Sequence, residues 1–246
     1  MKMNLRPAFR YQFRSALKSA IIFSLIMLAI LAVFSAVTVG GYAESRATFV
    51  GYGISAAVFM FVVGIVSIRS DLRLCLQFGV SRRSSFVSEI LALLTLSALL
   101  SVAGELITGL AQAMVLKAPS EHVFVCDLYQ IMYLKNGFAQ LSFAQHIMSG
   151  LVNTGLLLSL TLIGMFFSLM FWRLSKVWTV LVAISIPILI NLVPWLLLKI
   201  GFDPAPFIAW VLRSPIYYIL TCLAIAALFG TTNWLLLRKA NIKAPK

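Results

Sequence analysis

Charged residues are scarce in this sequence, and acidic ones are the scarcest. Of the 246 residues, 11% are charged and 61% are hydrophobic, with 7 Asp and Glu against 20 Lys and Arg. An average soluble domain is about 25% charged and roughly 45–50% apolar. A soluble fold could not hide this much apolar surface, so the composition predicts that a lipid bilayer surrounds most of the chain. The basic residues flank apolar runs, which favours a role in membrane orientation over nucleic-acid binding.

The common motifs of enzyme and metal chemistry are also absent. No Gly-Lys pair occurs, so the chain lacks the Gly-x-x-x-x-Gly-Lys-Ser/Thr loop that cradles nucleotide phosphates. The two histidines, His122 and His146, belong to no His/Glu/Asp cluster with metal-ligand spacing. The three cysteines, Cys75, Cys126 and Cys222, form no CxxC pattern, which argues against a disulfide framework. We therefore expect no enzyme activity, metal or cofactor in this chain.

Long apolar runs dominate the sequence instead. A membrane-spanning helix needs roughly 20 apolar residues at a rise of about 1.5 Å per residue, and barrel strands would alternate in polarity. Six runs meet the helical requirement and cover residues 20–41, 49–68, 86–116, 145–172, 177–200 and 215–237. The predicted fold class is therefore an all-α integral membrane protein with one transmembrane domain over residues 1–246.

An amphipathic helix is predicted before the first span, over residues 3–18. An apolar stripe and a basic stripe recur every four residues and lie side by side on this helix. The apolar stripe consists of Leu5, Phe9, Phe13 and Leu17, and the basic stripe consists of Arg6, Arg10, Arg14 and Lys18. Such a helix lies in the headgroup layer and contacts membrane lipids. Simple positive charges before a first span are the alternative, but they leave the apolar stripe unexplained.

The Lys and Arg residues divide unequally between the two sides of the predicted membrane. With the N-terminus inside, fifteen lie inside and five, Arg46, Lys117, Lys135, Lys199 and Arg213, lie outside. Cytoplasmic segments carry the excess of basic residues. The count therefore predicts an even number of spans with both termini in the cytoplasm.

The third predicted span carries polar residues on one helical face. They recur at steps of three or four and are Ser97, Ser101, Glu105, Thr108 and Gln112. A carboxylate in hydrocarbon costs about 2.5–3.5 kcal/mol, so this face should look at other helices or at water. Two interpretations stay open, the lining of a pathway and interhelical hydrogen bonds of roughly 0.6–2 kcal/mol each. Asn153 belongs to a similar but interrupted face on the fourth span.

The connection at residues 69–86 falls inside by the charge count. Its pattern predicts a short helix that begins with Ser70 as the cap and Asp71 at the N-terminus, where a negative charge is favourable. This helix ends at Gly79, and a second helix, capped by Ser81, follows it. One face of the short helix is apolar and consists of Leu72, Cys75 and Leu76. A plain connection would not need a capped, amphipathic helix, so we predict a docking element.

In these features the chain resembles the membrane subunits of bacterial type-2 ATP-binding-cassette (ABC) exporters. It has the basic amphipathic helix, six spans with both ends inside, and a Leu76-x-x-Gly79-x-Ser81-Arg82-x-x-x-Phe86 pattern between spans two and three. The resemblance implies two copies of a separate ATPase subunit, which binds ATP and Mg²⁺, and a second permease half, identical or homologous. It also implies that coupling to the ATPase involves Ser70, Asp71, Leu72, Arg73, Cys75, Leu76, Gly79, Ser81 and Arg82.

The function expected from this resemblance is export across the bacterial plasma membrane, driven by ATP that the separate subunit hydrolyses. The expected substrate is amphipathic, such as a drug, an antimicrobial peptide or a lipid-like molecule. One alternative is a non-transporting scaffold or immunity/sensor protein that binds a ligand through its outer loop, residues 117–144. Another is an ion- or proton-coupled carrier centred on Glu105, which would work without an ATPase.

Overall fold

The computed structural model describes nine helices and strands. It covers residues 5–39, 47–49, 51–115, 123–134, 141–173, 203 and 205–238, with the single positions 192, 196 and 199. In chain order the elements are α1 (Leu5–Val39), β1 (Ala47–Phe49), α2 (Gly51–Gln77), α3 (Arg82–Val115), β2 (Val123–Val125), α4 (Leu128–Tyr133), α5 (Phe143–Arg173), α7 (Ala205–Leu212) and α8 (Pro215–Arg238).

Five of these helices, α1, α2, α3, α5 and α8, are long and apolar enough to cross a membrane. Their outward faces carry large exposed apolar side chains, including Leu25, Val33, Val58, Leu106 and Leu228. A helical, multi-pass membrane protein has this arrangement. The predicted span at residues 177–200 lies outside the described residues except at positions 192, 196 and 199, each of which is helical.

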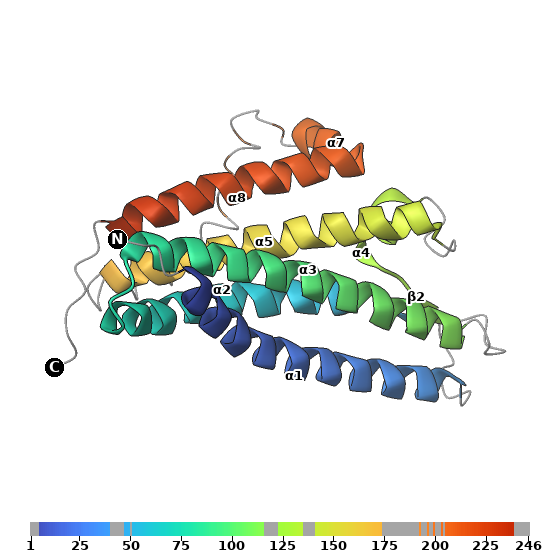
Figure 1. Cartoon of the computed structure of the whole chain (residues 1–246). Coiled ribbons are helices and arrows are strands. Elements are labelled where there is room, and N and C mark those ends of the chain that lie inside the picture. The colour runs from blue at the N-terminus through green and yellow to red at the C-terminus, as the bar shows by residue number, and fades with distance from the viewer. Residues whose placement is uncertain are drawn as a thin grey trace.

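The long helices form a bundle with two distinct ends (Figure 1). Helix α1 packs along α3, while α2 and α8 both pack along α5. The start of α1, the turn between α2 and α3, and the last turns of α5 and α8 lie together at what we call the turn end. The opposite end, called the strand end, holds α4 and the short parallel pairing of β1 with β2, in which Ala47 faces Val123.

The predicted boundary between an interfacial helix and the first span is wrong, because α1 runs unbroken from Leu5 to Val39. No glycine or proline follows Pro7 within α1 to interrupt it. The basic stripe of this segment is exposed, and the Phe9 and Phe13 rings stack at 5.6 Å. Ala8 and Gln12, however, are buried, so part of the segment packs on protein.

The predicted separate helix at residues 70–79 is wrong in its beginning and right in its end. Helix α2 continues through this segment to Gln77, because no glycine or proline lies between Gly64 and Gly79. Ser70 is therefore not a cap, and its Oγ donates instead to the Ser67 carbonyl within the helix, at 3.0 Å. Gly79, with φ of 72°, does terminate α2.

Candidate functional site

The turn between α2 and α3 is closed by caps on both sides. Val80 N donates to the Cys75 carbonyl at 2.9 Å, and Gly79 adopts the left-handed conformation that such a helix ending requires. Ser81 Oγ accepts a hydrogen bond from Ser84 N at 3.1 Å and so caps α3, as predicted. The backbone of the turn is thereby fixed between two long helices.

The inner side of the turn is buried against the chain itself. Asp71, Leu72 and Cys75 are between 1% and 5% exposed. Gln12 of α1 donates from Nε2 to the Ser85 carbonyl at 3.4 Å and to Cys75 Sγ at 3.9 Å. Gln12 therefore joins α1 to Cys75 and to α3, and the three buried coupling residues offer no surface to a partner. The side chains of Arg69, Arg73 and Leu76 lie outside the described part.

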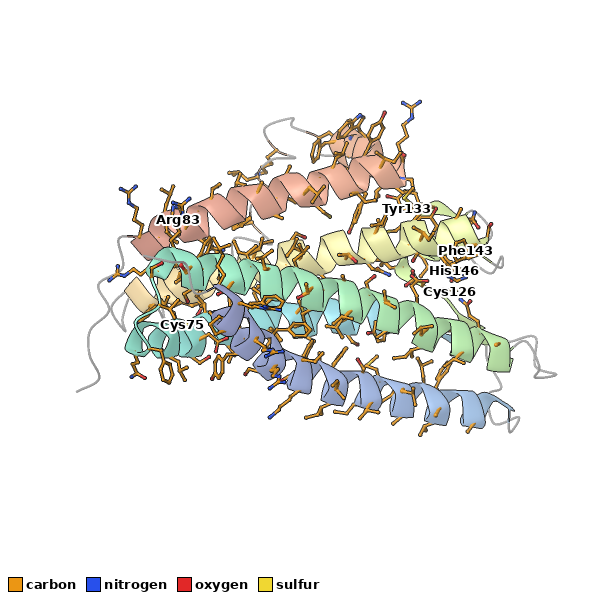
Figure 2. All side chains as sticks on the ribbon, in the orientation of Figure 1. Cys75, Arg83, Cys126, Tyr133, Phe143 and His146 are labelled. Carbon is orange, nitrogen blue, oxygen red and sulfur yellow. The ribbon has the colours of Figure 1, made fainter. Side chains whose placement is uncertain are left out.

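The outer side of the turn is open. Phe78 is 76% exposed at its tip, and Figure 2 shows Arg83 projecting from the same end. The other exposed residues here are Ser70, Gln77, Gly79 and Ser81, whereas Arg82 is partly buried. Phe78 was not among the predicted coupling residues, although an apolar side chain directly before a helix-ending glycine was visible in the sequence.

A second buried carboxyl group, Glu89, lies close to Asp71 at this end and was missed in the sequence. Glu89 is 2% exposed, and its Oε2 has no hydrogen-bond partner. Burial, together with the negative charges of Asp71 and Glu89, raises the pKa of the Cys75 thiol. The only signal in the sequence was one Glu, three residues after Phe86, in an apolar run.

A network of polar side chains connects three elements at the strand end. Glu105 of α3 places Oε2 3.0 Å from His146 Nδ1 of α5. Ser149 Oγ, also on α5, contacts both Glu105 Oε1 and Asp127 Oδ2. Asn153 Nδ2 donates to both Asp127 oxygens at 3.4 Å. Figure 2 labels His146 and Cys126, the neighbour of Asp127, at this end of the bundle.

Asp127 is positioned by the local structure of residues 123–134. It caps α4 by accepting from Tyr129 N at 3.4 Å, and its own N donates to Gln130 Oε1 at 2.8 Å. Gln112 of α3 donates from Nε2 to Gln130 Oε1 and to the Val125 carbonyl, both at 2.9 Å. The described part of the predicted outer loop is thus folded and attached to α3 and α5.

The predicted polar face of α3 divides into two groups. Ser97 and Thr108 donate to carbonyls of their own helix. Ser101 donates to the Gly150 carbonyl on α5 at 2.7 Å, and Glu105 and Gln112 reach other elements as described above. The interpretation as interhelical hydrogen bonding therefore describes three of the five residues.

Neither a metal cluster nor a relative provides a further guide to function. In the part of the chain that the structure describes, no group of three or more His, Cys, Asp and Glu residues is placed to hold a metal ion. Comparisons of the chain with protein-family models, with curated proteins and with solved structures found no match. Function is therefore inferred from the residues and their geometry.

Proposed function

We propose that this chain is the membrane-spanning permease subunit of a type-2 ABC exporter in the bacterial plasma membrane, with six spans and both termini in the cytoplasm. ATP and Mg²⁺ bind a separate ATPase subunit, present in two copies, and a second permease half, identical or homologous, completes the complex. The observation that carries this proposal is the capped α2–α3 turn with an exposed phenylalanine at its tip.

A turn that transmits force must be stiff and must be joined to long elements. Both neighbours of this turn, α2 and α3, continue without a break toward the strand end. Gln12 fastens the turn to α1, and α2 packs along α5. A displacement at Phe78 would therefore move several membrane helices together, and ATPase and permease states would be linked through the contacts that differ between them.

The burial of Asp71, Leu72 and Cys75 changes the set of residues that we propose to contact the ATPase. We assign the contact to the exposed side of the turn, with Phe78 at its centre. Aromatic side chains are enriched at the centres of protein interfaces. The substrate we propose is amphipathic (a drug, an antimicrobial peptide or a lipid-like molecule), because the described bundle buries few charged groups among many apolar ones.

The proposal is tested by purifying the tagged chain from its native membranes and identifying the proteins that accompany it. We expect an ATPase subunit in the wild type and about a tenfold or greater loss of that subunit in Phe78→Asp, since interface anchors contribute 2 kcal/mol or more. The matched control is Phe143→Asp, because Phe143 is 80% exposed at the strand end. Absence of any ATPase, or equal recovery with both variants, would contradict the proposal.

One observation favours a second candidate, a sensor or immunity protein that binds a ligand through residues 117–144. The described part of this segment is folded and hydrogen-bonded to α3 and α5, as a ligand-binding surface would need to be. This candidate predicts full activity in cells that lack the ATPase, whereas the exporter predicts none. Deletion of the ATPase gene therefore separates the two.

A further inference from the structure

We propose that Glu105, Ser149 and Asp127 hold one proton in common and that His146 exchanges this proton with the solvent. The site lies at the strand end, where Figure 2 labels His146, and it joins α3, α5 and the segment before α4. It does not depend on the exporter proposal, because it follows from the contacts within this chain alone.

The number of available protons carries the inference. A serine hydroxyl supplies one proton, and an ionised carboxylate only accepts hydrogen bonds. Ser149 Oγ contacts two carboxyl oxygens, Glu105 Oε1 and Asp127 Oδ2. Its proton can occupy one contact, so the other contact requires a proton on a carboxyl group. Two carboxyl groups that share a site also repel each other when both are ionised. This repulsion likewise favours one proton bound to the pair.

The exposure of the four side chains increases stepwise toward the solvent. Ser149 is fully buried and Asp127 is 5% exposed. The Glu105 side chain is 14% exposed, and that of His146 is 40% exposed. Ser149 contacts both Asp127 and Glu105, and Glu105 in turn contacts His146. The imidazole therefore connects the carboxyl pair with water.

The titratable groups around the site come from each element packed there. Cys126 precedes Asp127 and Tyr129 follows it by two residues. Burial, and to a smaller extent the negative charge of Asp127, raises the pKa of the Cys126 thiol. Tyr52 of α2 is directed away, since its hydroxyl donates to the Leu100 carbonyl at 2.9 Å. Among the described residues, His146 makes the only ion pair with either carboxyl group. Lys117 and Lys135 lie outside them.

Exchange of the proton needs no other reactant than water. The His146 imidazolium passes the proton from Nδ1 to Glu105 Oε2, and the imidazole regains a proton from a water molecule, which leaves as hydroxide into the solvent. After rotation of the Glu105 carboxyl group, its proton passes to Ser149 Oγ while the original hydroxyl proton passes to Asp127 Oδ2. The net change is one proton moved from water to Asp127, with Glu105 and Ser149 restored.

The bound proton affects the attachment of residues 123–134. Asp127 both caps α4 and contacts α5 through Ser149 and Asn153. When the proton is lost, two carboxylates face a single hydroxyl proton and repel each other. Release of the proton therefore weakens the contact between this segment and α5.

The test is infrared spectroscopy of the full-length protein in detergent, in which a protonated carboxylic acid gives a separate C=O stretching band. Buried Glu89 can give a band of its own, so the variants are compared in a Glu89→Gln background. In that background we expect a band at neutral pH that is lost when Glu105→Gln or Asp127→Asn is added, since either change leaves Ser149 in contact with a single carboxylate. In His146→Gln the band should remain, but its deuterium shift should appear about tenfold or more slowly after transfer to heavy water.

Glu89→Gln is the matched control, because it removes a different buried carboxyl group and should leave the band of the Glu105–Asp127 pair intact. A Glu89→Gln spectrum without the band would overturn the proposal, as would a band that persists when Glu105→Gln and Asp127→Asn are each added to Glu89→Gln. An unchanged exchange rate in His146→Gln would remove His146 from its assigned role. Circular dichroism establishes that each variant is folded.

Discussion

Burial at the turn end protects the Cys75 thiol. Cys75 is 3% exposed, and its Sγ accepts a contact from Gln12 Nε2 at 3.9 Å. Burial and the nearby charges of Asp71 and Glu89 raise its pKa, so less thiolate is present at neutral pH. Since the thiolate is the reactive species, both access and ionisation oppose chemical modification.

We therefore predict that maleimide will not label the native protein at neutral pH, because Cys75, Cys126 and Cys222 are all buried. Denaturation in detergent should expose all three thiols. Phe78→Cys, at a position that is 76% exposed, should react within the time in which the wild type stays unlabelled. Mass spectrometry of tryptic peptides identifies the modified residue, and rapid native labelling of Cys75 would show that the turn is not packed on α1.

The strand-end network shows which residues a sequence can and cannot indicate. Glu105 and Gln112 could be predicted as a polar face because helical spacing places them in line. Their partners could not, since His146 and Ser149 are more than 40 positions away from Glu105. Asp127 lay in a loop without periodicity, and only its capping role, three residues before Gln130, left a local signal.

At the scale of elements, α2 and α5 cross closely at two glycines. A Cβ atom added at Gly64 would clash with the Thr161 carbonyl oxygen, and one at Gly164 would clash with the Phe61 carbonyl oxygen. Small residues permit this approach in membranes, where packing rather than hydrophobic burial holds helices together. The crossing connects the helix of the turn to the helix that carries His146 and Ser149.

We predict that Gly64→Ala destabilises the protein by about 1–3 kcal/mol, because backbone atoms cannot yield to an added methyl group as side chains can. Alanine by itself favours a helix over glycine by up to about 1 kcal/mol. A loss of stability in Gly64→Ala can therefore be attributed to the close crossing of α2 and α5. Gly230→Ala in α8 is the control, since a Cβ there meets nothing within 4 Å, and it should be neutral or stabilising. Thermal unfolding in detergent measures both.

Element boundaries were predictable where one residue type decides them. Gly79 and Ser81 ended and began helices as expected, since left-handed backbone favours glycine and serine can accept from the first turn. Ser70 failed as a cap because nothing in the preceding sequence stopped α2. The same continuity joined the predicted interfacial helix to the first span in α1. Good capping residues do not create boundaries without a helix stop.

At the scale of the whole molecule, the polar features separate toward the two ends. The turn end holds the α2–α3 turn, the exposed basic stripe of α1, and Arg83. The strand end holds α4, the β1–β2 pairing and the network around Ser149. With the excess of basic residues on one side, this arrangement predicts that the turn end faces the cytoplasm and the strand end faces outward.

Two variants, each with one introduced cysteine, test this orientation in intact cells. Ser70→Cys and Phe143→Cys place exposed thiols at opposite ends of the bundle, above a background of three buried native cysteines. We expect a membrane-impermeant maleimide to label Phe143→Cys in intact cells and Ser70→Cys only after the membrane is permeabilised. The reverse pattern would place the α2–α3 turn outside, where no ATP-driven subunit could contact Phe78, and the exporter proposal would fail together with the orientation. The proton site of Glu105, Ser149 and Asp127 would survive that result, because its proton count comes from contacts within the chain, but His146 would then exchange its proton with the cytoplasm.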